Sequence, residues 1–414
     1  MQAPEHVVVV GAGMVGLSTA WFLQAEGVRV TVVDRVGVAA GSSWGNAGWL
    51  APALTLPLPD PAILAGGIKA TLKPSSPVYV PVSANPRLLR FLVDFARHCT
   101  APKWRDAMSV FAEANRQAFD AFDEIAAGGL AEPTKAAEPF LAAFASEGDR
   151  DALLEEFDHV RELGVETPAE LLDRDAVHAL VPALGDAVTC GVRLRDQRFI
   201  NPGRYVNALA DAVRERGAEI RTGVDVRDLT ESASGVRLDV AGGDALTADA
   251  VVIATGTWLG SLARDVGVKT IVQAGRGYSF TVQPEQMPSG PMYFPAQRVA
   301  CTPLGDGLRV AGMMEFRKPG APLDPRRVRA IIDAATPMLT GVDWDARTDE
   351  WVGSRPCTAD GLPLIGRTKS SRVFVSGGHG MWGIALGPLS GKLLAAQVAR
   401  GETSSLLSRF DPLR

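Results

Sequence analysis

The sequence predicts an α/β fold with a parallel sheet, combined with an α+β portion built on a mixed, mostly antiparallel sheet. A strand, glycine turn, helix and second strand follow one another over residues 6–35. A strand, glycine loop and helix recur over 373–401. Alternating strands and helices of this kind favour a parallel sheet. Strand-like runs broken by proline and glycine over 269–310 predict the antiparallel part.

The first of these patterns is a dinucleotide-binding fingerprint. Residues 7–10 are four valines, as in a strand buried on both faces. Gly11, Gly13 and Gly16 follow: the first permits a tight turn, the second lets the backbone approach a pyrophosphate, and the third lets helix and strand pack closely. The N-terminus of the helix predicted over 14–26 points its unpaired N–H groups at those phosphates.

A carboxylate completes the fingerprint. The second strand, 29–33, ends at Asp34, where an acid can bind the ribose hydroxyls of an adenosine. A glycine turn alone would also suit an ordinary loop, but strand, helix and acid stand here in register. An acid in place of a basic cluster disfavours NADP as the ligand.

Composition excludes several other classes. A chain of 414 residues with a net charge of −5 carries no nucleic-acid footprint. We expect no signal peptide, because a strand begins within the first ten residues, and no membrane span. The cysteines and histidines are scattered, so we expect reduced thiols of a cytoplasmic protein and no metal site; they are Cys99, Cys190, Cys301, Cys357, His6, His98, His159, His178 and His379.

Two irregular segments follow the fingerprint. Residues 41–49 are small and dense in backbone N–H donors, which suits contact with a bulky ring, although glycine and serine also favour a flexible surface loop. Residues 52–86 are rich in proline, so regular structure is not expected there. A lid, a partner-docking surface and a membrane-surface contact are equal alternatives for that segment.

The middle of the chain alternates helices and strands. Helices are expected over 85–127, 147–163, 169–182, 201–217 and 326–335, and strands over 218–229, 235–240 and 248–254. An apolar stripe at helical spacing in the first helical region indicates core packing and consists of Phe111, Ala114, Ala118, Phe119, Phe122 and Ile125. The last strand ends at Thr255 and Gly256, at the sheet edge where ligands bind.

The C-terminal glycine loop is the second informative motif. After a strand over 373–376, residues 377–383 read GGHGMWG and lead into a helix expected over 386–401. The positive end of that helix can stabilise negative charge on a ligand, although a simple helix cap would have the same composition.

Taken together, these motifs carry a family resemblance over nearly the whole chain. The fingerprint, SSWGNAG (42–48), the strand ending in ATG (254–256), WVGSRPCTADGLPLIG (351–366) and GHGMWG (378–383) resemble the FAD-dependent D-amino-acid dehydrogenases. Their wider relatives are the glycine, sarcosine and glyphosate oxidases of the D-amino-acid oxidase superfamily.

The resemblance implies a Rossmann-like FAD-binding domain of the glutathione-reductase type, interleaved with a substrate domain on a larger mixed sheet. We expect the FAD domain to comprise 1–84, 190–257 and 346–414, and the substrate domain 85–189 and 258–345. The cofactor-binding residues that it implies, together with those of the motifs above, are Gly11, Ala12, Gly13, Met14, Val15, Gly16, Asp34, Arg35, Ser42, Ser43, Asn46, Ala47, Gly48, Trp49, Val226, Thr255, Gly256, Gly378, His379, Gly380, Met381, Trp382, Gly383 and Ile384.

Three residues are expected near the reaction. Arg355 matches the arginine that binds the substrate carboxylate in glycine oxidase-like members, although a surface or bridging arginine is the alternative. Tyr278 is a candidate for the pocket wall, against a place in the core. His379 is expected to orient the glycine loop and the flavin edge rather than to act as a base. Cys357 is expected to be a packing residue.

This sequence also departs from the family pattern. Glycine oxidase-like members have an arginine where Met381 stands and a tyrosine where Val299 stands, so we expect a more apolar pocket. Sarcosine oxidases attach the flavin through a cysteine that would fall at Gly353, so we expect non-covalent FAD.

The function expected is oxidation of a D-amino acid to the 2-oxo acid and ammonia, by hydride transfer to flavin N5 and electron transfer to a quinone-type acceptor or O₂. One alternative is an oxidase or dehydrogenase of secondary amines such as sarcosine, glyphosate or iminodiacetate. Another is the flavoprotein subunit of a heteromeric amine or opine oxidase. We expect a cytoplasmic protein, with peripheral contact at the inner membrane face and an oligomer or partner subunit as open alternatives.

Overall fold

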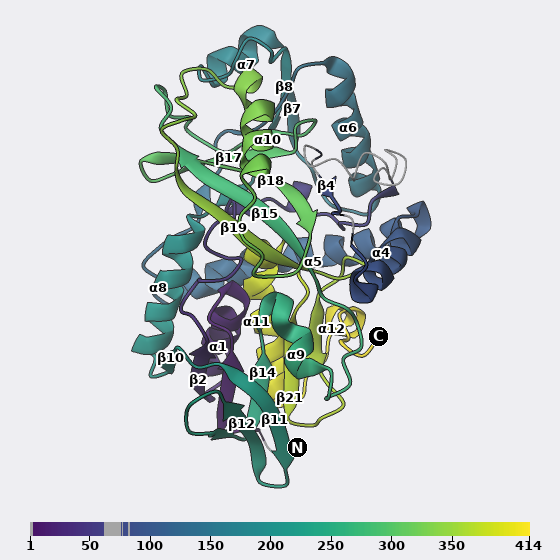
Figure 1. Cartoon of the computed structure of the whole chain (residues 1–414). Coiled ribbons are helices and arrows are strands. Elements are labelled where there is room, and N and C mark those ends of the chain that lie inside the picture. The colour runs from purple at the N-terminus through teal and green to yellow at the C-terminus, as the bar shows by residue number, and fades with distance from the viewer. Residues whose placement is uncertain (1–2, 62–75, 77, 82) are drawn as a thin grey trace.

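The computed structural model describes residues 3–61, 76, 78–81 and 83–414. Two large sheets dominate the molecule, one in the lower half and one in the upper half of Figure 1. The prediction of a parallel sheet together with a mostly antiparallel one is confirmed by their topology.

The lower sheet has six strands, and all its neighbours run parallel except the last pair. In order across the sheet they are β10 (Glu219–Thr222), β2 (Arg29–Asp34), β1 (His6–Val10), β14 (Ala250–Ile253), β21 (Val373–Gly377) and β20 (Leu364–Arg367). The four valines of β1 are buried at the centre of the sheet, as a strand covered on both faces requires.

Both faces of this sheet are covered. One face packs in a single apolar cluster with the helices α1 (Met14–Ala25), α5 (Ala101–Ala127), α8 (Pro202–Glu215) and α11 (Gly383–Arg400). The other packs against α9 (Leu259–Ala263) and a three-stranded sheet of β11 (Val226–Ser232), β12 (Gly235–Val240) and β13 (Leu246–Ala248). Gly391 lets α11 lie directly on α1, because a Cβ there would stand 2.6 Å from the Ser18 backbone.

The upper sheet has nine strands and is antiparallel apart from two pairs, β16 with β6 and β18 with β4. In order they are β19 (Thr348–Cys357), β15 (Gln273–Val282), β18 (Gly307–Phe316), β17 (Val299–Leu304), β16 (Met292–Phe294), β6 (Phe140–Phe144), β8 (Cys190–Leu194) and β7 (Ala169–Leu172), with β4 (Val78–Tyr79) beside β18. Apolar side chains of α7 (Arg174–Leu180) and α10 (Pro325–Ala335) pack on one face, and those of α6 (Glu147–Glu162) pack on the other.

The remaining elements connect these two layers. They are α4 (Pro86–His98), α12 (Ser405–Arg409), the 3₁₀ turns η1 (Pro52–Leu54), η2 (Gly256–Trp258) and η3 (Thr336–Met338), and a small sheet of β3 (Trp49–Leu50), β9 (Arg198–Phe199) and β5 (Lys135–Ala136). The helical stripe predicted from Phe111 to Ile125 lies in the core, as expected.

Three sequence predictions of secondary structure are wrong in detail. The helix expected over 169–182 is a strand followed by a short helix, because the Asp173 side chain caps α7 by accepting from the Ala176 N–H. The strand expected over 218–229 is two strands in different sheets, with Gly223 (φ +74°) between them. The C-terminal helix begins at Gly383, three residues earlier than expected.

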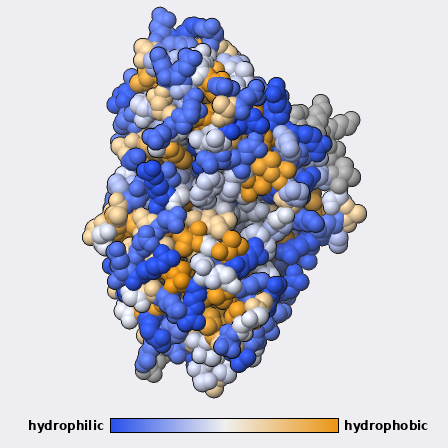
Figure 2. Space-filling view, turned by 60° about the vertical axis from the view of Figure 1, so that its left-hand side comes forward, coloured by the Kyte–Doolittle hydropathy of each residue, from blue (hydrophilic) through white to orange (hydrophobic). Residues whose placement is uncertain are grey.

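Residues 62–75 of the proline-rich segment lie outside the described residues, so its role stays open. The expected domain boundaries remain a proposal; β8 and β19, which we assigned to the FAD domain, are strands of the nine-stranded sheet. Within the described ranges no helix is long and apolar enough to cross a membrane. Figure 2 shows hydrophilic residues spread over the face in view, with hydrophobic ones in separate groups.

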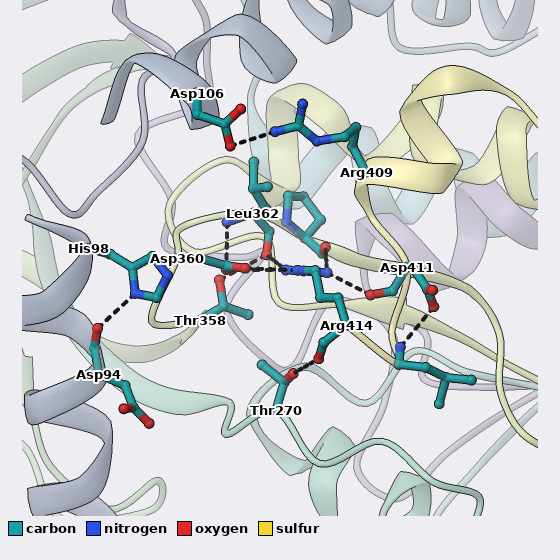
Figure 3. Close-up of polar contacts among 12 residues, drawn as sticks. Asp94, His98, Asp106, Thr270, Thr358, Asp360, Leu362, Arg409, Asp411 and Arg414 are labelled. Atoms are coloured by element: carbon teal, nitrogen blue, oxygen red, sulfur yellow. Dashed lines mark hydrogen bonds and ion pairs between the residues drawn. The ribbon is translucent and has the colours of Figure 1, made fainter. Parts of the chain in front are cut away.

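The C-terminal residue, Arg414, binds the segment that follows β19 (Figure 3). The Arg414 guanidinium contacts both carboxylate oxygens of Asp360, at 2.8 and 3.1 Å, and donates to the Leu362 carbonyl oxygen at 2.8 Å. The Thr358 hydroxyl donates to the same carbonyl. Burial alone would raise the pKa of Asp360, but the bonds and charge of Arg414 outweigh it, so that pKa lies below its usual value.

Candidate functional site

A cavity of about 1330 Å³ extends between the two sheets. Its wall includes the carboxyl ends of β1, β2, β14 and β21 on one side, and β16, β17, β18 and β19 on the other. Pockets for single small ligands are commonly 300–1,000 Å³, so this volume suits a dinucleotide together with a small substrate.

The fingerprint turn has no room for side chains. Gly11 adopts φ +121°, and a Cβ there would stand 2.4 Å from the Ala254 carbonyl oxygen. A Cβ on Gly16 would stand 1.9 Å from the Gly11 carbonyl oxygen. Both neighbours are backbone atoms that cannot turn away. The turn therefore requires glycine at both positions. The N-terminus of α1, which follows the turn, lines the cavity.

Asp34 at the end of β2 organises this turn. One carboxylate oxygen accepts from the Ala12 N–H at 2.9 Å. The other accepts from the N–H groups of Val36 and Gly37 at 2.8 and 3.0 Å. Asp34 lines the cavity, so its carboxylate also faces the space predicted for a ribose. That contact with a ribose remains a proposal.

An aromatic platform stands beside Asp34. The Arg35 guanidinium lies 3.8 Å from the ring centroid of Trp258, in cation–π geometry. Val226, Thr255 and Gly256 line the same end of the cavity. This apolar, partly cationic corner is where the predicted adenosine end of a dinucleotide would lie.

The loop 41–49 is fastened to the nine-stranded sheet. The Ser42 hydroxyl donates to the Ser354 carbonyl oxygen at 2.5 Å, and the Ser279 hydroxyl donates to the Gly45 carbonyl oxygen at 2.9 Å. The Trp351 ring lies over Gly45, where a Cβ would approach it to 2.1 Å. The small residues of this loop therefore serve a close approach, and the surface-loop interpretation is wrong.

The end of this loop is equally fixed. The Asn46 side-chain oxygen accepts from the Gly48 N–H at 2.8 Å, and Gly48 takes φ +81°. The indole N–H of Trp49 donates to the Thr302 hydroxyl at 2.9 Å. At the other end of the loop, Ser43 Oγ accepts from the Met14 N–H at 3.2 Å. The loop thus joins the first turn of α1 to the upper sheet.

The C-terminal glycine loop closes the same cavity. The Gly380 N–H donates to the Pro356 carbonyl oxygen at 2.8 Å, and the Trp382 indole N–H donates to the Leu56 carbonyl oxygen at 2.7 Å. Helix α11 begins at the next residue, Gly383. Its N-terminal N–H groups stand at the cavity wall, ready for a negatively charged ligand edge.

His379 holds that loop as a neutral ring. Its Nε2 is 2.8 Å from the Ser390 hydroxyl, which itself donates to the Leu386 carbonyl oxygen, so Nε2 is the donor. Burial lowers the pKa of His379 to about 4. A neutral ring held by Ser390 would suit the expected role of orienting the loop, which stays a proposal.

Three buried polar atoms on the cavity wall test whether FAD fits. Thr255 Oγ1, Ser376 Oγ and His379 Nδ1 have no hydrogen-bond partner in the described structure. Buried polar groups are normally paired. A ligand rich in hydroxyl, phosphate and ring N–H groups would satisfy them, so the residues present fit FAD.

Arg355 faces the cavity from β19. Its guanidinium lies over Gly277 of the neighbouring strand, where a Cβ would approach it to 2.2 Å. One nitrogen donates to the Met313 carbonyl oxygen at 2.8 Å, and within the described ranges no carboxylate lies at ion-pair distance. Burial lowers the pKa of Arg355, yet a guanidinium stays charged. Its charge is therefore available to an anionic ligand.

Tyr278 does not line the cavity, contrary to the candidate role given to it. Its neighbours Gly277 and Ser279 face the loop and Arg355, so strand alternation turns Tyr278 to the opposite face. There it is buried, and its hydroxyl donates to Glu315 at 2.5 Å. Cys357 is also buried in an apolar cluster, as expected for a packing residue.

All the remaining predicted residues line the cavity, apart from Ala12, Gly16, Gly48 and Gly378, which shape the turns behind the cavity wall. It also contains residues that sequence reasoning missed, namely Tyr293, Arg298, Glu156, Trp258, Trp351 and Ser376. Trp258 lies two residues after the ATG turn, and Trp351 and Ser376 lie in or beside quoted motifs. No sequence signal connects α6 with the turn that carries Arg298.

Comparisons with known proteins agree with this geometry. The model of the DAO family, described as FAD dependent oxidoreductase, matches residues 6–397. The D-amino acid dehydrogenase of Phenylobacterium zucineum (strain HLK1) is 31% identical over 409 residues, covering 95% of this chain and 94% of the relative.

Solved structures share the fold. Glycine oxidase from Geobacillus kaustophilus superposes with a TM-score of 0.73 at 21% identity, over 100% of this chain and 99% of the other. Iminodiacetate oxidase from Chelativorans sp. BNC1 superposes with a TM-score of 0.73 at 17% identity, over 98% of each chain. With the family model matching nearly its whole length, this chain belongs to the DAO family and is an FAD-dependent oxidoreductase.

Proposed function

We propose that this enzyme oxidises a D-amino acid to the 2-oxo acid and ammonia and passes the electrons to a quinone-type acceptor. The observation that carries the proposal is the Arg355 guanidinium, which faces the cavity without a carboxylate partner among the described residues. A planar guanidinium of this kind suits a carboxylate, to which it can donate two parallel hydrogen bonds. Similarity to a D-amino acid dehydrogenase supports the same substrate class.

The residues of this chain would bind and orient the reactants. When bound, FAD supplies the two-electron oxidation by taking up the substrate Cα hydrogen as hydride. Arg355 would hold the carboxylate and so decide which face of the Cα presents its hydrogen. Water then hydrolyses the resulting imine. A substrate amine that binds neutral needs no strong base, which agrees with the low pKa of His379 at about 4.

We propose that the FAD is held without a covalent bond. Gly353 occupies the position where related enzymes carry the attaching cysteine, and no cysteine is found on the described part of the cavity wall. Denaturing the yellow protein with acid should release all of the flavin into the supernatant. Flavin remaining with the precipitated chain would contradict this proposal.

The secondary-amine alternative uses the same guanidinium. An N-substituted glycine also offers one carboxylate to Arg355, and the fold is shared with an enzyme named for iminodiacetate. The acceptor, a partner subunit, the cytoplasmic location and peripheral membrane contact remain proposals. Reoxidation of the reduced enzyme in air tests whether O₂ is the acceptor, and the mass of the purified protein in solution tests for a partner subunit.

The test of the substrate class is anaerobic reduction of the flavin. D-amino acids should bleach the bound flavin faster than L-amino acids and N-alkyl glycines. Bleaching by N-alkyl glycines alone would replace the proposal with the secondary-amine alternative, and no bleaching by any compound in the panel would refute both.

The role of Arg355 has its own test. Arg355→Lys should raise KM for a D-amino acid by about tenfold or more, because lysine keeps the charge but loses the bidentate contact. Arg214→Lys, on the exposed face of α8, is the matched control and should leave KM unchanged. An unchanged KM in Arg355→Lys would remove this residue from the substrate site.

A further inference from the structure

The end of the cavity away from the glycine turn carries a polar cluster that the proposed mechanism does not use. Tyr293 lies on β16, Arg298 lies in the turn between β16 and β17, and Glu156 lies on α6. All three line the cavity. The sequence predicted an apolar pocket from Met381 and Val299. Met381 lines the cavity elsewhere and Val299 is buried in an apolar cluster, so this end of the cavity differs from that expectation.

Arg298 is held in an unusual backbone conformation. It takes φ +54°, a region that non-glycine residues seldom adopt and that costs about 1 kcal/mol. Its guanidinium lies near Tyr293, whose charge raises the pKa of Arg298, so the guanidinium stays charged. Within the described ranges it has no carboxylate at ion-pair distance, although Glu156 and Asp60 act on it from further away.

Glu156 offsets that charge only in part. Burial, and then the charge of Asp60, raise the pKa of Glu156 to about 7, against the opposite effect of Arg298. A carboxyl group with this pKa is substantially protonated near neutral pH, and its O–H then donates while its carbonyl oxygen can still accept. The cluster therefore presents mainly hydrogen-bond donors to the cavity.

Small residues separate this cluster from Arg355. Trp351, Ser279, Ala311, Ala300 and Tyr293 are direct partners in register across five neighbouring strands, so their side chains share the cavity face. The two alanines have small side chains, so they leave space in the cavity above β18 and β17.

The spacing of these strands sets the length of ligand that can reach both guanidinium groups. The Arg355 guanidinium lies over β15, two strands from β17 and three from β16, and neighbouring strands are about 4.8 Å apart. The distance from that guanidinium to the subsite is therefore roughly 10–14 Å. An amino acid with a side chain of several carbons could hold its carboxylate at Arg355 and reach Tyr293 and Arg298 with its far end.

We infer that Arg298 and Tyr293 form a specificity-determining subsite that selects substrates whose side chain ends in a hydrogen-bond acceptor, a carboxylate or a carboxamide. This inference rests on the proposed function, in which Arg355 holds the other carboxylate. It gives a role to a cavity-lining guanidinium that has no carboxylate at ion-pair distance among the described residues.

The test compares two non-reactive ligands by the change that they cause in the flavin absorbance of the holoenzyme. Adipate and hexanoate have chains of equal length and differ in the terminal group. Adipate should bind about ten- to a hundredfold more tightly, as expected for charge-assisted hydrogen bonds. Arg298→Leu should abolish that preference, and Arg298→Lys should restore part of it. Arg214→Leu on the exposed face of α8 is the control and should keep the full preference.

A second readout uses substrates. The ratio of kcat/KM for D-glutamate and D-glutamine over D-norleucine should fall about tenfold or more in Arg298→Leu. A fall for D-glutamate alone would assign the subsite to carboxylates, and a fall for both would assign it to acceptor groups in general.

The outcomes separate this inference from the function beneath it. Equal binding of adipate and hexanoate by the native enzyme, or an unchanged preference in a folded Arg298→Leu holoenzyme, would overturn the distal subsite alone. If neither ligand perturbs the flavin, and no amino acid bleaches it, the proposed function fails together with the subsite.

Discussion

The two walls of the cavity are built by different means. On the wall made by the six-stranded sheet the glycine turn presents backbone groups, since Gly11 and Gly16 leave no room for side chains and Asp34 binds the N–H groups of the turn. The wall made by the nine-stranded sheet presents charged side chains, with the Arg355 guanidinium over Gly277 and Arg298 further along the cavity.

The difference separates two tasks. A turn of backbone N–H groups binds any dinucleotide phosphate and suits a cofactor that is always the same. Charged side chains on a strand can be exchanged without disturbing the fold, so they suit the choice of a substrate. Substitutions in the first wall should therefore abolish FAD binding. Substitutions in the second wall should leave FAD binding intact and change which substrates the enzyme accepts.

The largest effect is expected at the glycine turn. Gly16→Ala places a Cβ 1.9 Å from the Gly11 carbonyl oxygen and should yield a protein purified without FAD. Gly37→Ala is the control, since a Cβ there has open space and the N–H to Asp34 remains. The flavin content per chain is the measurement, and a Gly16→Ala protein with a full complement of FAD would break the comparison.

His379 links the first wall to stability. Its pKa in the folded protein is about 4, below the 6.5 of a free histidine, so only the unfolded chain takes up a proton between these values. Stability should fall by about 3 kcal/mol as the pH decreases from 6.5 to 4.

His379→Asn should lose much of that pH dependence in denaturant unfolding of the holoenzyme. The control is His178→Asn on α7, which leaves the buried ring in place and should keep the full slope. A slope that is equally steep in His379→Asn would show that the histidine is not held neutral.

The second wall is tested at Gly277. Gly277→Val fills the space under the Arg355 guanidinium and should raise KM for a D-amino acid by about tenfold or more while the flavin content stays complete. Gly243→Val in an exposed turn is the control. Loss of flavin in Gly277→Val would contradict the division of tasks between the walls.

The smallest effect is expected at the ion pair of Arg414 with Asp360, in the segment that follows β19. Asp360→Asn should lower the free energy of unfolding by about 1–2 kcal/mol, because Asp360 and Arg414 are largely shielded from solvent. Arg409→Ala, which breaks an exposed pair with Asp106, should cost about 0.5 kcal/mol or less. Since the pKa of Asp360 is lowered, its contribution is present at neutral pH and is lost as the pH falls below about 4.

The sequence predicted the first wall well because its interactions are local. Strand, turn, helix and acid lie within residues 6–35, and the glycine loop at 377–383 lies directly between its strand and helix.

The residues of the second wall were harder to predict from the sequence, because the pairing of strands that are far apart in the chain brings them together. Tyr278 was a candidate for the pocket, but a one-residue alternation decides its face, and only the pairing of β15 with β19 fixes that alternation. Arg298 and Glu156 are far apart in the chain and meet only through the packing of α6 on the sheet. The resemblance supplied Arg355, which spacing alone would not have selected.

The most direct test of the central claim is a titration of the holoenzyme with hexanoate, followed by the flavin absorbance. If Arg355 presents a carboxylate to the flavin, the native enzyme and Arg298→Leu will show the same saturable change, and Arg355→Leu will keep its flavin but bind hexanoate at least about tenfold more weakly. Equal affinity in Arg355→Leu and the native enzyme would contradict the account.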